Sequence, residues 1–539
     1  MSRILVLIPL MIYLGTAGQP SLWIEWGWRG GAMVLLGIIL LVFVTGLWGR
    51  SLARAANDTP DYVAWIRFQR GLLLARILIV VWFALGAIAL GYANWVRQLM
   101  GPVETRFDVR LPGLLIATFP AIIGFMGLWW SAYPVERLMR ERSVLLTLND
   151  GLPVRRPPGF IDYFISNFRL QLLFVLVPVL GVIVLSDIFT ALLRATDIKP
   201  DRWVGEAILL GSVAVIFVLV PVALVHVLRT SSLEKGSPLR KDLDDVARVT
   251  KQSFHDIRVW HTNHSMSNAA VMGVIRRARF VLMSDLLIET LTPRQLQAVF
   301  AHEAGHVRYH HLAWYALYLA SFLMVLAAPA DWLFGKLLAT GLTSPDTAAT
   351  VITTIIAIVF IYLFGMLARL FERQADAYAA RTLELLPPPQ SDLFFTPSPF
   401  APASLEGAQT NQVTSEELDN SGKPDRSPDR LPDQIPVGRR GARDFASALS
   451  RVVEINHMPY DPRPRFGSVF VKLSHWLAYR TSYFLHPSPA ERLEHLEYLS
   501  RNPAASAAFD QKLHLTRVAL LLLFGTLIVW TTLWLTQQP

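Results

Sequence analysis

The amino-acid sequence predicts a predominantly α-helical, polytopic membrane protein of about eight or nine transmembrane helices, with a small mixed α/β domain. Composition is the first observation behind this prediction. Hydrophobic residues make up 53% of the 539 residues, charged residues only 17%, and the mean hydropathy is +0.38. A water-soluble protein with this balance would expose large apolar patches, which a lipid bilayer would instead accommodate.

The second observation is that the apolar residues gather into long runs. The first run, Ile4–Leu14, is short for a bilayer that needs about 20 residues. A signal peptide within residues 1–18 would give the same pattern, and we favour a retained, membrane-embedded segment. Longer runs that predict transmembrane helices follow at Gly31–Trp48, Ala75–Val96, Leu111–Tyr133, Leu170–Leu193, Glu206–Leu228, Leu312–Phe334, Ala348–Leu370 and Val518–Leu535.

The distribution of basic residues predicts which loops face the cytoplasm. Loops 49–71 and 134–170 carry four and six arginines and alternate with loops that are poorer in basic residues. Cytoplasmic loops of membrane proteins are enriched in Lys and Arg, so the richer loops are assigned to the cytoplasm. Segments 229–311 and 371–516 then face the cytoplasm too, and we expect an integral protein of the cell membrane, either an inner or a plasma membrane.

Charge and cysteine content exclude several function classes. The net charge of +9 is interpreted as loop charge of a membrane protein, so neither a nucleic acid nor a nucleotide is expected as a partner. The chain contains no cysteine, which excludes disulfides, thiolate metal ligands and a cysteine nucleophile.

The motif H-E-x-x-H at residues 302–306 is the strongest candidate for chemistry. Pro293 marks the start of a predicted helix through the motif. On that helix His302 and His306 leave the same face, so both can reach one tetrahedral zinc ion. Glu303 lies beside the first histidine, where its carboxylate can take a proton from a water molecule. Because such a short string also arises by chance, the rest of the chain has to support it.

A third metal ligand is needed for a catalytic zinc site. His310 is near in sequence, but a continuous helix would place it about 12 Å of rise beyond His302. We therefore interpret His310 and His311 as a polar helix end at the membrane surface.

Glu372 is the better candidate for the third ligand. It follows the apolar run 348–370 and shares a helical face with Asp376. One of these carboxylates can bind zinc while the other accepts the N–H of a ligating histidine. An exposed helix start with paired charges would give the same pattern. The two apolar runs between the motifs, however, predict a hairpin that returns Glu372 to the membrane face of His302.

The motifs resemble the integral-membrane zinc metallopeptidases of the type I CAAX prenyl protease and the HtpX heat-shock protease, which are gluzincin-like. H-E-x-x-H, a transmembrane hairpin and then E-x-x-A-D follow in the order of that family. Asn268-Ala269, leading through Gly273 to Met283-Ser-Asp-Leu-Leu, is similar to its edge strand and the segment before its zinc helix. His486-Pro-Ser-Pro-Ala-Glu-Arg492-Leu is similar to its C-terminal motif. The matches cover roughly residues 240–385 and 465–500.

The resemblance implies a zincin-like catalytic domain, one Zn²⁺ per chain, and a role for each matching residue. The implied metal ligands are His302, His306 and Glu372; the catalytic residues are Glu303 as base and His486 at the oxyanion; Asp376 supports a ligating histidine; and Asn268, Ala269 and Arg492 belong to the substrate-binding region, Arg492 as a brace. The implied partners are a peptide or protein substrate, lipidated or not, and the bilayer.

These observations divide the chain into seven segments. They are an N-terminal multi-span membrane region at 1–228, the first part of the catalytic domain at 229–311, a transmembrane hairpin at 312–370, a third-ligand helix at 371–385, a disordered proline-rich insertion at 386–440, the C-terminal part of the catalytic domain at 441–516, and a last transmembrane helix with a tail at 517–539.

The predicted function is a membrane-embedded zinc endopeptidase that cuts membrane-associated or lipidated proteins near the cytoplasmic face. Two alternatives remain open at this point. One is quality-control cleavage of membrane proteins in place of prenyl-protein processing. The other is a non-catalytic, zinc-binding membrane scaffold, against which the intact Glu303 argues, since metal binding alone does not need that carboxylate.

Overall fold

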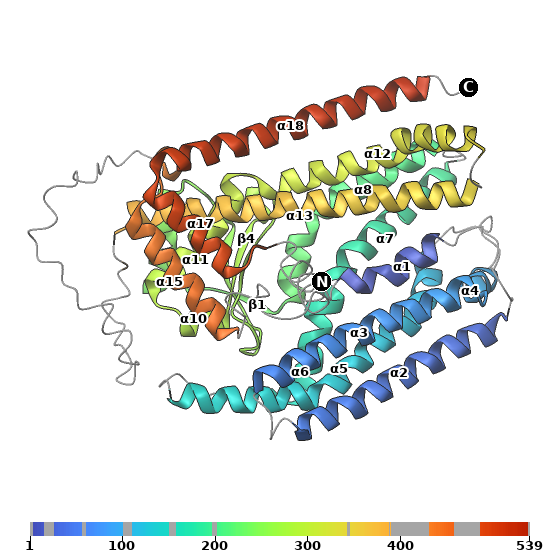
Figure 1. Cartoon of the computed structure of the whole chain (residues 1–539), viewed down its shortest axis with the longest axis horizontal. Helices are drawn as coiled ribbons and strands as arrows, with labels where there is room; N and C mark the ends of the chain where they lie inside the picture. Colours follow the sequence, from blue (N-terminus) through green and yellow to red (C-terminus); the bar gives the residue numbers. More distant parts are fainter. Residues whose placement is uncertain are drawn as a thin grey trace, which may run out of the picture. The chain divides into compact units, whose positions relative to one another are not determined.

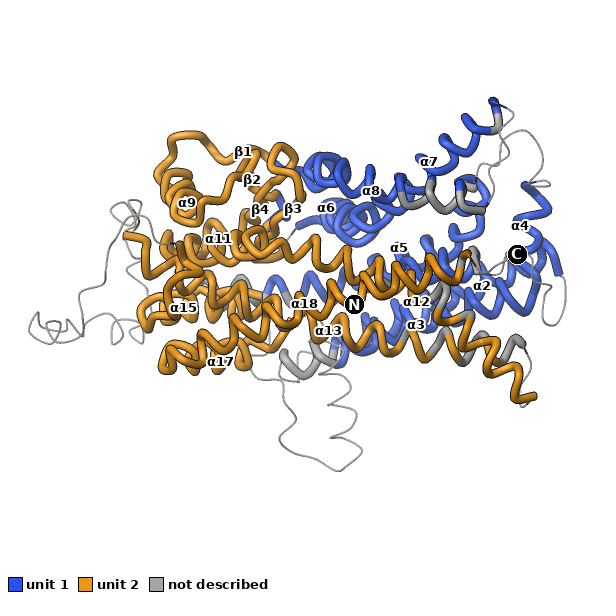
Figure 2. The backbone as a smooth tube through the Cα atoms, turned by 90° about the horizontal axis from the view of Figure 1, so that it is seen from above, with its two compact units in different colours: residues 1–230, 261–263, 397–414 blue, residues 231–260, 264–396, 415–539 orange. Residues whose placement is uncertain are grey.

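The computed structural model describes residues 4–15, 26–55, 61–100, 110–149, 158–196, 202–341, 345–387, 389, 431–456 and 486–536. The chain forms two compact units, coloured separately in Figure 2. Unit 1 comprises residues 1–230, 261–263 and 397–414, and unit 2 comprises residues 231–260, 264–396 and 415–539. The predicted insertion at 386–440 lies mostly outside the described residues, as do residues 1–3 and 16–18 of the N-terminal segment.

Unit 1 is a bundle of helices. Its elements are η1 (Ile4–Val6), α1 (Leu7–Gly15), α2 (Trp28–Ala55), α3 (Asp61–Ile88), α4 (Tyr92–Met100), α5 (Arg110–Asn149), α6 (Phe160–Asn167), the π-helix η2 (Phe168–Leu173), α7 (Phe174–Ala195) and α8 (Arg202–Val227). The long helices α2, α3 and α5 pack together, as Figure 1 shows, around fully buried residues such as Ile38, Phe68 and Leu128. Many large apolar side chains on their outer faces are exposed, as expected for surfaces that contact lipid.

The helices confirm a polytopic membrane protein. Among the described residues, five stretches are long and apolar enough to cross a bilayer: Trp28–Arg54, Arg67–Ile88, Leu111–Leu138, Phe160–Leu193 and Pro503–Trp534. A shorter apolar stretch, Gly211–Val227, lies in α8. The predicted runs Leu312–Phe334 and Ala348–Leu370 lie within two further long helices of unit 2, α12 and α13.

Unit 2 combines a small sheet with helices. Its strands are β1 (Thr230–Ser232, whose first residue is counted in unit 1), β2 (Asp256–Trp260), β3 (Ala269–Met272) and β4 (Phe280–Ser284). Its helices are α9 (Pro238–Val249), η3 (Arg276–Ala278), α10 (Asp285–Thr290), α11 (Pro293–Arg308), α12 (His311–Ala339), α13 (Pro345–Leu385), η5 (Pro432–Gln434), α15 (Arg439–Ile455), α17 (Pro489–Arg501) and α18 (Pro503–Thr536). The strand order is β1-β2-β4-β3, with β4 parallel to β2 and antiparallel to β3.

Two of these elements bear directly on the predictions. The apolar residues Phe280–Met283, whose sequence is typical of a short buried strand, lie in β4, and β3, which begins directly after Asn268, forms an edge of the sheet. The third-ligand helix expected at 371–385 is not a separate element, because α13 runs unbroken from Pro345 to Leu385. The helix that contains the apolar run 348–370 therefore also carries Glu372.

Helix α13 is the element around which the catalytic part of unit 2 packs. Beyond its apolar run it is almost fully buried, with Phe371, Tyr378 and Leu383 inaccessible to solvent. It contacts α11 and α15 along this segment. A Cβ atom on Gly305 of α11 would lie only 3.1 Å from Ala375 Cα, so the absence of a side chain permits this close approach.

Gly273 offers a test of the connection between β3 and β4. It has a φ of +96°, and an added Cβ would lie 2.0 Å from the Ala278 carbonyl oxygen. Gly236 has a similar φ of +94° with open space around the Cβ position. We expect Gly236→Ala to cost about 1 kcal/mol of unfolding free energy, and Gly273→Ala to cost about 1–3 kcal/mol more because of the clash.

Thermal unfolding of both variants in detergent would measure this difference. Equal loss of stability in the two variants would mean that the β3–β4 connection yields to the extra methyl group and does not fix the edge strand.

Candidate metal centre and active site

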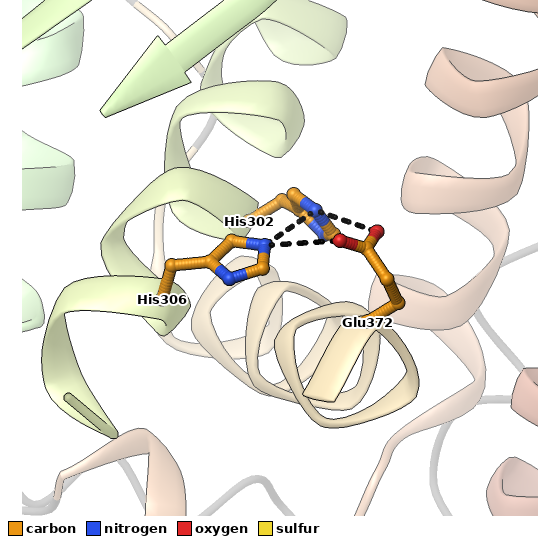
Figure 3. Close-up of side chains that lie close together, drawn as sticks. All are labelled: His302, His306 and Glu372. Carbon is orange, nitrogen blue, oxygen red and sulfur yellow. Dashed lines mark hydrogen bonds and ion pairs between the residues drawn. The ribbon is translucent and has the colours of Figure 1, made fainter. Parts of the chain in front are cut away.

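Helices α11 and α13 bring three potential metal ligands together. Thr292 and Gln295 form a capping box at the start of α11, with Pro293 in the first turn as the sequence predicted. His302 and His306 then project from one face of α11 toward Glu372 of α13, as Figure 3 shows. The ligand atoms of these three residues all lie within 4.8 Å of one another.

The distances in this group fit a tetrahedral zinc ion. His302 Nε2 and His306 Nε2 are 3.2 Å apart. Glu372 Oε2 lies 3.7 Å from His302 Nε2, and Glu372 Oε1 lies 3.6 Å from His306 Nε2. Ligand atoms at 2.0–2.1 Å from a tetrahedral centre are about 3.3–3.4 Å apart. Two imidazoles and one carboxylate are also a donor set that catalytic zinc sites use. The three residues could therefore hold the metal with a fourth position left for water or substrate.

Asp376 and Arg492 lie behind His302. His302 Nδ1 is 2.9 Å from Asp376 Oδ1, within hydrogen-bonding distance although the ring is poorly aligned for a linear bond. Arg492 of α17 donates to both Asp376 oxygens, one of them at 2.8 Å. Phe445 of α15 stacks on His302 with 5.9 Å between ring centroids. The side chain of Arg492 is thus engaged with Asp376, which fits the bracing role better than direct contact with a substrate.

Electrostatics keeps Glu372 and Asp376 of α13 ionised. Burial disfavours the charged form of both carboxylates, but their neighbours outweigh it. Arg492 holds the pKa of Asp376 below its ordinary value, and His486 together with His306 holds the pKa of Glu372 well below its usual range. Both residues therefore remain carboxylates, the form that a metal or an imidazole N–H requires. Burial lowers the pKa of His306 to about 4, so its ring is neutral near pH 7.

Glu303 reaches the edge strand from α11. Its Oε2 accepts a hydrogen bond of 2.9 Å from the Val271 N–H of β3. Burial raises the pKa of Glu303 and the nearby Glu372 carboxylate raises it further, against the opposing effects of His302 and the Val271 N–H. Glu303 is consequently a stronger base than a solvated glutamate, which suits proton transfer near neutral pH.

The register of β3 determines which backbone groups face outward. The Ser284 N–H donates to the Asn268 carbonyl, so Asn268 and Ser284 form a hydrogen-bonded pair. Pairs alternate along an antiparallel ladder, so Ala270 and Met272 are bonded to β4, whereas Ala269 and Val271 direct their N–H and C=O groups away from it. The Asn268 side chain is exposed at the start of this edge.

His486 reaches the same site from the start of the segment 486–536. Its Nδ1 lies 3.1 Å from Glu372 Oε1, and two thirds of its side chain remains exposed. The residues that follow explain the local sequence: Ser488 caps α17 in a capping box with Glu491, and Pro489 occupies the first turn. An exposed imidazole beside the metal group is free to meet a ligand.

His311 is the residue that the sequence analysis misplaced. It was expected at the membrane surface, but it is 1% exposed and its Nδ1 lies 2.8 Å from Nδ1 of His306. The chain leaves the helical path at His310, which has a φ of +53°, and α12 begins anew at His311. The only sequence signal is the pair of histidines itself, because helical periodicity cannot anticipate this turn.

Comparison with known proteins places the site in a family. Residues 235–500 match the model of peptidase family M48. Among solved structures, the fold is similar to the crystal structure of Ste24p from S. mikatae, with 13% sequence identity and a TM-score of 0.38, over 87% of this chain and 98% of that chain. A comparison with curated protein sequences finds no match.

The family match spans the candidate site residues from Asn268 to Arg492, and the helices that flank it in the sequence include ones long and apolar enough to cross a membrane. Residues 235–500 therefore form a domain of peptidase family M48, and the chain is a membrane zinc metalloprotease.

Proposed function

We propose that this chain is a membrane-embedded zinc endopeptidase in which His302, His306 and Glu372 hold a single zinc ion and Glu303 is the catalytic base. The observation that carries the proposal is the geometry of α11. It directs two histidines toward Glu372 and directs Glu303 toward the outward-facing edge of β3. Metal ligands, a base and a strand that can hold a peptide are thereby within reach of one scissile bond.

Each residue has a distinct task in hydrolysis. A zinc ion bound here supplies Lewis-acid polarisation of the scissile carbonyl and lowers the pKa of water. Glu303 removes a proton from the attacking water and later delivers it to the leaving amine. His486, exposed next to Glu372, donates a hydrogen bond to the carbonyl oxygen as negative charge develops on it. Asp376, held by Arg492, fixes the orientation of His302.

The edge strand supports the binding of an extended peptide. The side chain of Asn456, at the C-terminus of α15, accepts a hydrogen bond from the Ser267 N–H and donates one to the Ser267 carbonyl. These two backbone groups are therefore already engaged. The Val271 N–H is engaged by Glu303. Within the described residues, this leaves the Ala269 N–H and C=O as a free outward-facing pair, to which a substrate strand can add by main-chain hydrogen bonds. Such binding sets the register of the peptide with little demand on its sequence.

The position of the site in the sequence supports the proposal that its substrates are associated with a membrane. Glu372 follows the apolar run of α13 directly, and α12, which carries the preceding run, begins three residues after the zinc helix ends. A scissile bond at this site is thus next to the apolar part of the hairpin. With the arginine-rich loops assigned to the cytoplasm, the cut falls near the cytoplasmic face, on membrane-associated or lipidated proteins.

Glu303→Gln tests the base. We expect the variant to retain zinc, because Glu303 is not a ligand, and to lose proteolysis by a factor of about 10² or more, since proton transfer contributes about 10²–10⁴. Metal analysis of the purified protein and cleavage of casein would measure both properties. Glu454→Gln, a change of the same kind on the exposed face of α15, should behave like the wild type. Proteolysis at the wild-type level by Glu303→Gln would contradict the assignment.

Val271→Pro tests the contact between the edge strand and the base. Proline removes the N–H that points to Glu303 without removing a bond of the ladder, as proline can on an edge strand. Because this N–H stabilises the carboxylate, its loss should raise the pKa of Glu303 and move the acidic limb of the pH profile of kcat/KM to higher pH. Ala270→Pro is the matched control: it removes a ladder bond and should lower the thermal stability instead. An unchanged acidic limb in a folded Val271→Pro variant would contradict the prediction.

A pair of peptides tests the substrate class. A farnesylated peptide and its unmodified twin of the same sequence would be offered to the purified protein in detergent or vesicles. Processing of lipidated proteins predicts a kcat/KM at least about tenfold higher for the farnesylated peptide, since burial of several methylene groups contributes about 0.8 kcal/mol each. Equal cleavage of both would instead favour quality control of membrane proteins.

A further inference from the structure

The second zinc histidine is supported by a chain of hydrogen-bonding side chains that ends on the C-terminal helix. His306 Nδ1 lies 2.8 Å from His311 Nδ1, and His311 Nε2 lies 3.0 Å from Gln374 Oε1. Arg517 of α18 donates to the same Gln374 oxygen at 2.6 Å. His311 and Gln374 are 1% and 3% exposed, so bulk water does not compete for these contacts.

The chemistry of these four side chains determines which atom donates and which accepts in each contact. Arg517 has donors only, so the Gln374 atom that it contacts is the carbonyl oxygen. That oxygen has a second lone pair, which accepts the Nε2–H of His311. The His311 Nδ1 is then an acceptor, and it receives the Nδ1–H of His306. With its proton on Nδ1, His306 presents the lone pair of Nε2 to the metal group, which is the nitrogen that faces His302 and Glu372.

Packing holds the two ends of the chain in place. The His311 ring stacks on Phe371 with a centroid distance of 4.3 Å and an interplanar angle of 3°. The Arg517 guanidinium lies 5.2–5.9 Å from the ring centroids of Tyr309, Trp314 and Phe371, within the range of cation–π attraction. A charged group boxed by three rings and a short hydrogen bond has little freedom to turn away from Gln374.

We infer that His311, Gln374 and Arg517 form a positioning relay for His306 and make α18 part of the metal centre. The relay rests on the proposed binding of zinc by His306. It orients the His306 ring, fixes its tautomer and strengthens its lone pair as a ligand. Asp376, held by Arg492, lies 2.9 Å from His302 Nδ1, so each zinc histidine faces a separate arm that ends on an arginine.

Two matched pairs of variants separate this role from simple packing. His311→Leu fills the space but offers no acceptor, whereas His311→Asn places an oxygen near the position of Nδ1 and can accept from His306. Arg517→Met keeps the stem among the aromatic rings but loses the donor, whereas Arg517→Lys keeps one donor. A role in packing alone would make both members of each pair alike.

The measurements are zinc affinity, by competition with a chelator, and the visible absorption spectrum of the protein loaded with Co²⁺. We expect the zinc Kd to rise about 10- to 100-fold in His311→Leu and by less in Arg517→Met, with a changed Co²⁺ spectrum in both. His311→Asn and Arg517→Lys should recover most of the loss. Thermal unfolding of the metal-free variants identifies any that fail to fold, and for those the Asn and Lys variants carry the test.

The outcomes distinguish the relay from the proposed function. A wild-type protein that binds no zinc would overturn both. A wild type that binds zinc tightly while folded His311→Leu and Arg517→Met have its affinity and its Co²⁺ spectrum would overturn the relay and leave the zinc site intact. Equal losses in His311→Leu and His311→Asn would also overturn it, because restoring the acceptor would then have no effect.

Discussion

The close packing of α11 on α13 is the constraint on which the metal centre depends. Two of the proposed ligands lie on one helix and the third on the other, so the distance between the helix axes decides whether the three can share an ion. Gly305, which lies between His302 and His306, lacks the side chain that would separate the helices at Ala375. The residues that give the site its chemistry and the residue that permits the approach are therefore parts of the same short stretch.

Helix α13 contributes side chains to several parts of the site. Glu372 faces the metal group, Asp376 one turn later faces His302, and Gln374 lies on a different face toward His311. Burial of these polar groups would be costly if any were left without a partner. A buried ion pair such as Asp376–Arg492 adds little net stability but is expensive to break, so its main consequence is a fixed geometry.

The sequence was informative where the relevant geometry is local. His302, His306 and Glu303 follow from helical spacing, and Glu372 follows from a hairpin that returns the chain to the same place. The edge strand was expected from the family resemblance at Asn268-Ala269, whereas β4 is visible in the sequence as a short apolar segment. His311 was misplaced because the left-handed turn at His310 breaks the helix and turns the chain back toward His306. The engagement of the Val271 N–H by Glu303 depends on the register between β3 and β4, which no single segment encodes.

The final apolar helix gave no functional signal in the sequence, since a run of apolar residues after an arginine is typical of any membrane-spanning segment. Its role follows from which side chains donate and which accept in the hydrogen bonds that connect it to His306. Arginine donates and never accepts, so the group next to it, Asp376 in one arm and the Gln374 oxygen in the other, is an acceptor. The hydrogen bonds of each arm therefore require the zinc histidine to donate its Nδ1–H outward, which leaves Nε2 for the metal. Arg492 on α17 and Arg517 on α18 both act from elements that follow the three ligands in sequence. The metal centre is thus completed only when these last two helices have packed against α13.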